Sequence, residues 1–362
     1  ITYVIEIIAL VGVSQALFAS FLIFTKKENS QSDKVLSLWL ALLALDFLSC
    51  ALDYLIFSKP LLSSSFLLFN PALFLYICSL TDRKFRLRPV YLLHLVPFLL
   101  FKLIAYWVQE AFAMNTFFDL DSFFLYRIAF GTATVISSIV YNFLSLRLVH
   151  RHRVSLQAER SNIDQNESIG WVLFVSVSYT VYCIIAVVVA MVSYFTKSYP
   201  LSPHIYNYAV LLGLIYILSF YGLYQLRLSL FSEDIEEERI PYQKSLLTTE
   251  AKGQIQEKIE EYVVGQKAYL DPNLSMEVIS KKLKVPKYQL TEVLNTVIGK
   301  NFFQYVNHFR VEEVKKMLSD KDNTYSIEAI GFDCGFASKS SFYTLFKNAT
   351  GMTPTAYRDS LA

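Results

Sequence analysis

Seven long apolar runs in the first 226 residues limit what this chain can fold into. A helix needs about 20 mostly apolar residues to cross the ~30 Å hydrocarbon core of a bilayer. Inside that core only a helix pairs every backbone polar group within its own segment. The sequence therefore predicts an all-α fold in which residues 1–226 form a bundle of seven transmembrane helices, at residues 2–25, 35–57, 61–80, 90–108, 125–149, 171–195 and 205–226.

Basic residues in the loops predict the orientation of this bundle, because Lys and Arg accumulate in short cytoplasmic loops. One set of alternate loops carries eleven of them: Lys26, Lys27, Lys34, Arg83, Lys84, Arg86, Arg88, Arg147, Arg151, Arg153 and Arg160. The opposite set carries Lys59 and Lys197, together with Arg127 at the edge of a span. We therefore expect the N-terminus outside and the C-terminal region in the cytoplasm. The first run has no basic leader and no small-residue cleavage site, so we interpret it as a retained helix.

One outer loop, residues 109–124, is acidic and rich in Phe. Two interpretations stay open for it. The first is a belt of aromatic side chains at the membrane interface. The second is a lid over an outward-facing pocket.

The chain changes character at Arg227, after which its composition is that of an ordinary charged, helical protein. Residues 227–249 form an acidic juxtamembrane linker, interpreted as a solvated connection or as a spacer repelled by anionic lipid. Residues 250–271 then form a connecting segment, in which a helix over 250–269 is predicted. Its apolar positions share one face at helical spacing: Ile255, Ile259, Tyr262 and Val263.

One pattern occurs twice in the remaining region, residues 272–362. Ser275 and Ser326 each precede a short amphipathic helix, and Gly299 and Gly351 each follow a second helix. Ser is a preferred helix N-cap, and Gly a preferred residue just beyond a helix end. Two helices joined by a tight turn and repeated at a constant offset predict two helix-turn-helix units. The units cover residues 275–299 and 326–351.

A single amphipathic helix is predicted between the two units, over residues 301–318. Four apolar residues on it are expected to face the core: Phe302, Val306, Phe309 and Leu318. Such a helix would hold the two units at a fixed separation.

The segment GFDCGFASKSSFYTLFKNATGMTPTAYR, residues 331–358, closely resembles the signature of the AraC/XylS family of transcription regulators. The resemblance extends over residues 272–358 and implies that the second helix of each unit enters the major groove of double-stranded DNA. Residues 70–100 also resemble a membrane-bound subgroup of these regulators, with matches at Pro71, Tyr76, His94 and Pro97. This second resemblance implies a location in the bacterial cytoplasmic (inner) membrane.

Helical spacing assigns two faces to the second recognition helix. Phe342, Leu345, Phe346 and Ala349 are expected to face inward. The remaining residues are expected to face DNA: Lys339, Ser340, Ser341, Tyr343, Thr344 and Lys347. The resemblance implies that Ser340, Ser341 and Thr344 read bases, whereas the two lysines suit phosphate contacts.

In the first unit the corresponding DNA-facing residues are Lys287, Tyr288 and Thr291. Two interpretations stay open for the neighbouring Glu292. It accepts a hydrogen bond from the amino group of cytosine, or it lies in solvent. Residues 272–362 carry 12 Lys and Arg against 9 Asp and Glu, a net charge of +3. This charge predicts weak non-specific DNA binding, which a homodimer would strengthen through effective concentration.

Ionisable residues inside the predicted spans suggest a second site, because such groups are costly at membrane depth. Glu6, Asp53, Lys102 and Arg127 fall in the outer parts of their helices. Asp46 shares a face with Asp53, and His94 lies deeper. One interpretation is a set of structural ion pairs. The other is an outward-open site for a small-molecule or membrane-borne ligand, with a possible pH-sensing role for His94.

These observations predict a membrane-integral one-component transcription regulator whose bundle senses a signal. The alternative is a receptor or transporter-like protein whose tail acts on a protein partner instead of DNA. No nucleophile motif, paired-acid signature or metal-ligand spacing supports an enzyme, a metal site or a cofactor. The four cysteines have no CxxC spacing and are interpreted as small buried residues.

Overall fold

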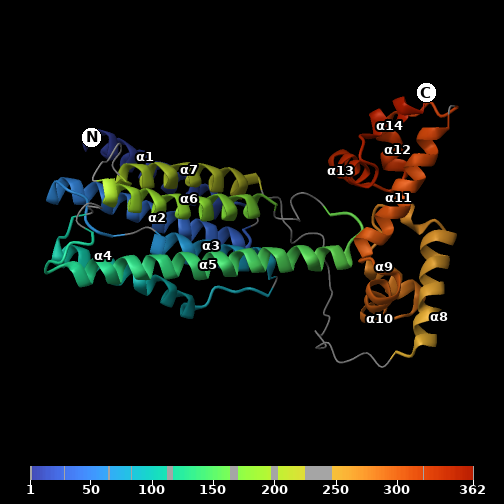
Figure 1. Cartoon of the computed structure of the whole chain (residues 1–362), viewed down its shortest axis with the longest axis horizontal. Helices are drawn as coiled ribbons and strands as arrows, with labels where there is room; N and C mark the ends of the chain where they lie inside the picture. The colour runs from blue at the N-terminus through green and yellow to red at the C-terminus, as the bar shows by residue number, and fades with distance from the viewer. Residues whose placement is uncertain are drawn as a thin grey trace. The chain divides into compact units, whose positions relative to one another are not determined.

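The computed structural model describes residues 2–27, 29–63, 66–82, 84–111, 117–163, 170–196, 203–224, 247–320 and 322–361. Its contacts divide the chain into two units (Figure 1). The bundle unit comprises residues 1–150 and 169–232, and the C-terminal unit comprises residues 151–168 and 233–362. Most of the predicted acidic linker, namely residues 227–246, lies outside the described residues.

Helices account for the regular structure of the bundle unit. They are α1 (Thr2–Phe24), α2 (Gln31–Phe57), α3 (Phe66–Thr81), α4 (Val96–Val108), α5 (Phe124–Glu159), α6 (Gly170–Thr196) and α7 (Pro203–Tyr224). Only isolated β-bridges occur among the described residues, so the prediction of an all-α fold is confirmed. Five helical segments are long and apolar enough to cross a membrane: 4–24, 31–57, 89–108, 124–159 and 205–223. Shorter apolar helices cover residues 66–81 and 170–185, so seven crossings remain a prediction.

At three places the helices differ in extent from the predicted spans. The third helix begins at Phe66 instead of residue 61, because Leu61 forms a β-bridge with Ala111 and Leu62 donates its N–H to the Glu110 carbonyl. The fourth span begins with a 3₁₀ turn, Pro89–Leu95, which gives way to α4 where Pro97 lies in the first turn. The fifth helix continues ten residues past residue 149 to Glu159, because its polar end contains neither Gly nor Pro to stop it.

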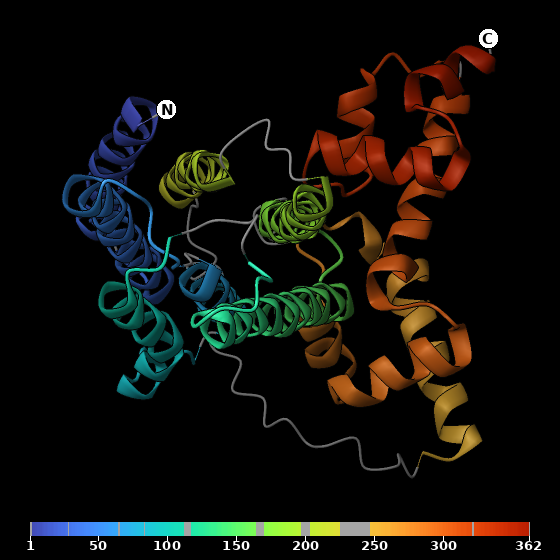
Figure 2. The same ribbon diagram turned by 60° about the vertical axis from the view of Figure 1, so that its left-hand side comes forward.

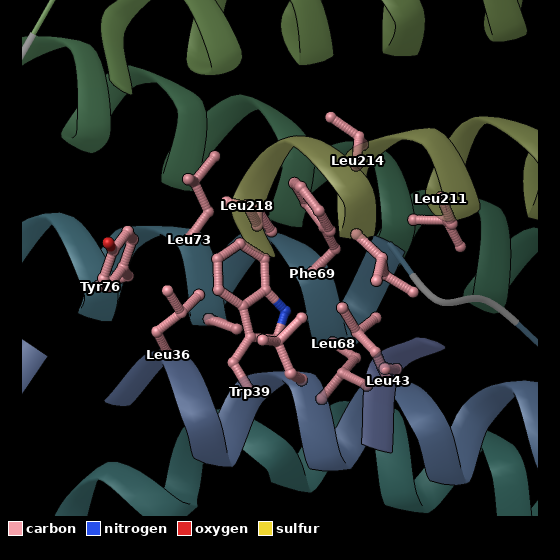
Figure 3. Packing of buried hydrophobic residues seen from close by; sticks show 14 of the residues in the cluster. Leu36, Trp39, Leu43, Leu68, Phe69, Leu73, Tyr76, Leu211, Leu214 and Leu218 are labelled. Atoms are coloured by element: carbon pink, nitrogen blue, oxygen red, sulfur yellow. The ribbon is translucent and has the colours of Figure 1, made fainter. Parts of the chain in front are cut away.

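Aromatic and aliphatic side chains fill the core of the bundle unit (Figure 3). The indole of Trp39 meets the ring of Phe69 edge-on at 5.0 Å between centroids, among leucines from α2, α3 and α7. Phe69 in turn packs against Tyr179 of α6, with their ring centroids 4.0 Å apart. The core therefore joins helices that are far apart in the sequence.

The outside of the bundle unit is apolar, whereas several of its charged groups are inside. Ile7, Phe21 and Leu103 are each more than half exposed. Asp53 and Arg127, in contrast, are only 1% exposed. This distribution is the reverse of the one that water selects for soluble proteins.

Besides the end of α5, the C-terminal unit consists of shorter helices (Figure 2). They are α8 (Thr249–Glu260), α9 (Met276–Leu283), α10 (Lys287–Val293), α11 (Phe302–Ser319), α12 (Ile327–Asp333), α13 (Lys339–Thr350) and α14 (Pro354–Ser360). A π-helical turn extends α8 to Gly265, and another extends α10 to Ile298. The connecting helix thus ends four residues before its predicted end at residue 269.

Two small cores stabilise the C-terminal unit, and α11 contributes to both. Phe302 and Val306 pack in the first core with residues of α8, α9 and α10. Val314 and Leu318 pack in the second core with residues of α12 and α13. The predicted role of this helix, to hold two helix-turn-helix units together, agrees with this packing.

Candidate nucleic-acid interface

Local capping determines where α12 and α13 of the second unit begin and where the second helix of each unit ends. The hydroxyl oxygens of Ser326 and Ser338 accept the backbone N–H groups of Ala329 and Ser341, at 3.1 and 3.3 Å. Gly299 and Gly351 follow the second helices with φ of +73° and +79°, in the left-handed region that Gly adopts without strain. Each unit therefore presents a short second helix that its own sequence delimits.

The second recognition helix, α13, exposes a polar face. Phe342 and Phe346 are buried, as predicted, and their rings pack 6.1 Å apart in the second core. Ser340, Thr344 and Lys347 are exposed, and Ser341 is half-buried. Ala349 was predicted to face inward but is exposed, because the second core contacts α13 only as far as Phe346.

Lys339, at the start of α13, is directed toward its own unit. Its ammonium pairs with the Glu328 carboxylate of α12. The same ammonium lies 5.8 Å from the centroid of the half-buried Tyr343 ring. The hydrogen bond to Glu328 raises the pKa of Lys339, so this group stays charged at neutral pH. A phosphate contact by Lys339 would compete with Glu328, whereas Lys347 forms no ion pair with any residue that the structure describes.

The first recognition helix, α10, is more closely covered. Tyr288 is 57% exposed, whereas Lys287 and Thr291 are half-buried. The Glu292 carboxylate lies 2.7 Å from the Lys252 ammonium of α8. The interpretation of Glu292 as a solvated residue was therefore wrong, because the connecting helix supplies a cation to it.

Two glycines allow the second unit to pack closely. A Cβ on Gly331 would lie 2.6 Å from Cδ1 of Phe342, so only Gly fits where α12 crosses α13. Gly335, in the turn, has φ of +89°, and a Cβ there would lie 2.7 Å from the carbonyl oxygens of Tyr269 and Leu270. The turn of the second unit thus rests on the backbone that leads into the first unit.

Two buried polar residues on α11 were not predicted from the sequence. Arg310 is fully buried and Asn307 is 4% exposed. A signal was available for Arg310, because it continues the four-residue spacing of the inward-facing Phe302 and Val306. Its hydrogen-bond partners come from remote segments, which no sequence pattern indicates.

The ionisable residues of the bundle unit do not form the single group that the sequence suggested. Lys102 pairs with Asp53 at 3.5 Å and donates to the Ser63 hydroxyl at 3.1 Å. Glu6 is half-buried and forms no ion pair within the described part of the chain.

Arg127 instead binds the loop that precedes α5. It pairs with Glu110 at 2.8 Å and Asp121 at 2.7 Å, and donates to the carbonyls of Phe117 and Asp119. Residues 112–116 of this loop lie outside the described residues.

His94 and Asp46 make separate contacts. Nδ1 of His94 lies 2.6 Å from the Tyr141 hydroxyl, and the Asp46 carboxylate accepts from Tyr208 at 3.3 Å. A small pocket beside His94 is lined mainly by apolar atoms, including those of Trp39. No group of three or more His, Cys, Asp and Glu side chains with metal-site geometry occurs among the described residues.

Comparisons with known proteins agree on the C-terminal region. Residues 279–360 match the profile of a family described as "Helix-turn-helix domain". An uncharacterized HTH-type transcriptional regulator from Bacillus subtilis, YobQ, is 31% identical over 30% of this chain and 45% of its own length. The melibiose operon regulatory protein of Escherichia coli is 31% identical over 24% of this chain and 28% of its own length. The chain thus spans less than half the length of these relatives.

A solved structure of a transcriptional regulator with an AraC-type DNA-binding domain, from Chromobacterium violaceum, is 26% identical. It covers 30% of this chain and 96% of its own, with a TM-score of 0.28. The helices and the sequence matches define the C-terminal region as a helix-turn-helix domain similar to those of transcription regulators. This domain is of the AraC type.

Proposed function

We propose that this chain is a membrane-integral one-component transcription regulator that binds specific double-stranded DNA through both helix-turn-helix units. The observation that carries the proposal is the pair of second helices, α10 and α13, which one helix, α11, holds within a single unit. The outward residues of α13 combine hydroxyls, which suit base edges, with Lys347, which suits phosphate.

The distribution of polarity in the bundle unit supports a location in the bacterial cytoplasmic membrane. Exposed apolar side chains have a favourable environment in lipid, whereas ionisable groups at that depth must face the interior and find partners. Asp53 and Lys102 follow this rule. With the basic loops inside, the proposed topology places the N-terminus outside and the AraC-type domain in the cytoplasm.

The bundle unit is proposed to sense a small-molecule or membrane-borne signal and to pass it to the C-terminal unit. A net charge of +3 on residues 272–362 gives a single domain little non-specific attraction for DNA. Homodimerisation in the membrane would then raise the affinity for a two-part site through effective concentration.

Selection of DNA by the full chain in lipid nanodiscs tests the proposal. A random duplex pool is enriched on the nanodiscs, and the selected duplex is compared with a scrambled one of equal length and composition. The proposal expects binding at least ~10³-fold tighter to the selected duplex at physiological salt, as for specific regulators. Equal affinity for both duplexes would reject it and favour a tail that acts on a protein partner.

A further inference from the structure

The polar end of α5 packs inside the C-terminal unit. Residues 157–162, here called the docking segment, belong to that unit by their contacts. Arg160 forms a backbone bridge with Ser275, the N-cap of α9. The Ser161 side chain is fully buried, and its hydroxyl donates to the Leu274 carbonyl at 2.5 Å. The docking segment therefore begins its contacts where the first helix-turn-helix unit begins.

Asn162 links the two helix-turn-helix units through one side chain. Its amide nitrogen donates to the Pro272 carbonyl at 2.7 Å and to the Gly335 carbonyl at 2.9 Å. Its amide oxygen accepts the backbone N–H of Ala337 at 3.4 Å. Pro272 precedes the first unit, whereas Gly335 and Ala337 form the turn of the second. All three groups are backbone, so this link does not depend on the orientation of another side chain.

Arg310 of α11 lies beneath the docking segment and depends on it for partners. Its guanidinium donates to the carbonyls of Tyr269 and Asp271 and to Asn307. Two further hydrogen bonds go to Ser161, one to its carbonyl at 3.2 Å and one to its hydroxyl at 3.1 Å. The Asn307 amide also donates to that carbonyl, at 2.8 Å. Ser161 thus completes a polar network centred on the helix that joins the units.

The environment of Arg310 makes these contacts important. Burial lowers its pKa to about 10, so the guanidinium is still charged at neutral pH. It forms no ion pair among the described residues. It donates to carbonyl, amide and hydroxyl oxygens and lies 6.0 Å from the centroid of the Phe336 ring. Loss of Ser161 would leave part of a buried charge without a partner, which is costly in a low-dielectric interior.

We propose that the docking segment holds the two helix-turn-helix units and α11 in one arrangement, and that α5 controls DNA binding by docking or releasing it. The exposed residues Ser340, Thr344 and Lys347 make none of the contacts described above, so docking leaves the proposed DNA-facing side of α13 accessible. Two recognition helices held at a fixed spacing lose less freedom on binding successive grooves. Here a complete site consists of two half-sites, one for each helix-turn-helix unit of the chain. Docking therefore favours the binding of both units to their half-sites at once.

The continuity of α5 gives the bundle unit a direct connection to this site. One helix runs from Phe124 to Glu159, with the Arg127 network near its first residue and the docking segment at its end. The inference rests on the proposed DNA-binding function and adds the contact by which that function is regulated.

A double variant of the full chain in nanodiscs, Ser161→Ala with Asn162→Ala, tests the docking segment. Its affinity is measured for the selected duplex and for a duplex in which one half-site is scrambled. We expect a loss of about ten-fold or more on the complete site and less than two-fold on the half-site. Ser155→Ala, an exposed position on the same helix, is the matched control and should match the parent chain. Equal changes on both duplexes, no change, or tighter binding to the complete site would overturn the proposal.

Chemical labelling provides a readout that survives if the double variant fails to fold. The rate of maleimide labelling of Ser161→Cys is compared with that of Ser155→Cys. The labelling of the parent chain is subtracted from both, since its four cysteines are free and mostly buried. Docking predicts that the cysteine at 161 reacts at least about ten-fold more slowly than the one at 155. Because docking and DNA binding are thermodynamically linked, the complete DNA site should further slow the reaction of the cysteine at 161. The duplex with one scrambled half-site should not slow it.

The labelling result separates the inference from the proposed function. Equal rates at positions 155 and 161, or no effect of the complete site on a chain that binds it, would overturn the docking proposal. Failure of the parent chain to bind any selected duplex would instead reject the proposed function.

Discussion

The Lys252 ammonium on the connecting helix lies 2.7 Å from the Glu292 carboxylate on the first recognition helix. Glu292 is only 14% exposed in its side chain, and Lys252 is 25% exposed. The pair therefore joins α8 to the helix that is proposed to enter DNA. It also places a negative charge on the proposed DNA-binding helix and pairs that charge within the protein.

Neutralising this acid should strengthen DNA binding without changing sequence preference. In Glu292→Gln, Lys252 no longer faces a carboxylate and becomes available to phosphate. We expect tighter binding to all duplexes and a salt dependence of the binding constant steeper by up to about 0.9 in log–log slope. Fluorescence anisotropy over a salt series measures both. Glu257→Gln, an exposed position on α8, serves as the control, and a changed base preference in Glu292→Gln would contradict the prediction.

Hydroxyl residues and the lysine of α13 should have different effects on DNA recognition. Removing the hydroxyl of Ser340, Ser341 or Thr344 should change base preference at one position, by about 1–3 kcal/mol where a contact is lost. Lys347→Ala should weaken binding to all sequences similarly and flatten the salt dependence. Affinities for a panel of single-base variants of the selected duplex distinguish the two effects. If Lys347→Ala altered base preference and the hydroxyl variants did not, the assignment of the α13 face would be wrong.

Gly335→Ala should destabilise the C-terminal unit more than the same change at a helix end. At Gly335 the added Cβ meets two backbone oxygens at 2.7 Å, in addition to the left-handed φ. At Gly299 the φ is also positive, but nothing lies within 4 Å of an added Cβ. Backbone strain alone costs about 1–2 kcal/mol, so Gly335→Ala should exceed that cost and Gly299→Ala should stay within it. Protease resistance of the C-terminal unit in a urea series compares them, and equal losses would refute the close-contact argument.

Fusions to alkaline phosphatase test the proposed topology. A fusion in the loop of residues 109–124 should be active, because that loop is expected outside. A fusion in residues 150–168 should be inactive, because the basic residues there are expected in the cytoplasm. Equal expression of both fusions is checked by immunoblot. The reverse pattern of activity would place the AraC-type domain outside and reject the architecture.

Asp53→Asn tests whether the buried pair with Lys102 is structural. The change nearly preserves volume but leaves the ammonium of Lys102, a residue that is only 8% exposed, without its carboxylate. Removing one partner of a buried pair costs about 3–5 kcal/mol, so the abundance of the chain in the membrane should fall. Neutralising the partner with Lys102→Met should restore it. Normal abundance together with an altered response of a reporter strain would instead favour the ligand-site interpretation.

Local features of the sequence determined the helices and most of their ends. Ser326, Ser338 and Gly351 lie where capping rules place them, because a cap depends on atoms within three or four residues. The apolar runs likewise predicted the all-α bundle from composition alone. The length of α5 was underestimated, because its polar end has no local signal that stops a helix and the end of an apolar run does not end a helix.

Only the tertiary structure decided which polar groups meet. Of the four charges expected at similar depth, Lys102 pairs with Asp53, whereas Arg127 pairs with Asp121, which lies outside that set. Arg310 and Ser161 are 149 residues apart, and their hydrogen bonds require both helix-turn-helix units to be packed first. The free energy gained by burying an apolar side chain is proportional to its area, so it can be predicted residue by residue. A hydrogen bond instead needs two groups within about 3.2 Å in the right direction. That distance depends on the whole fold, and no periodicity in the sequence encodes it.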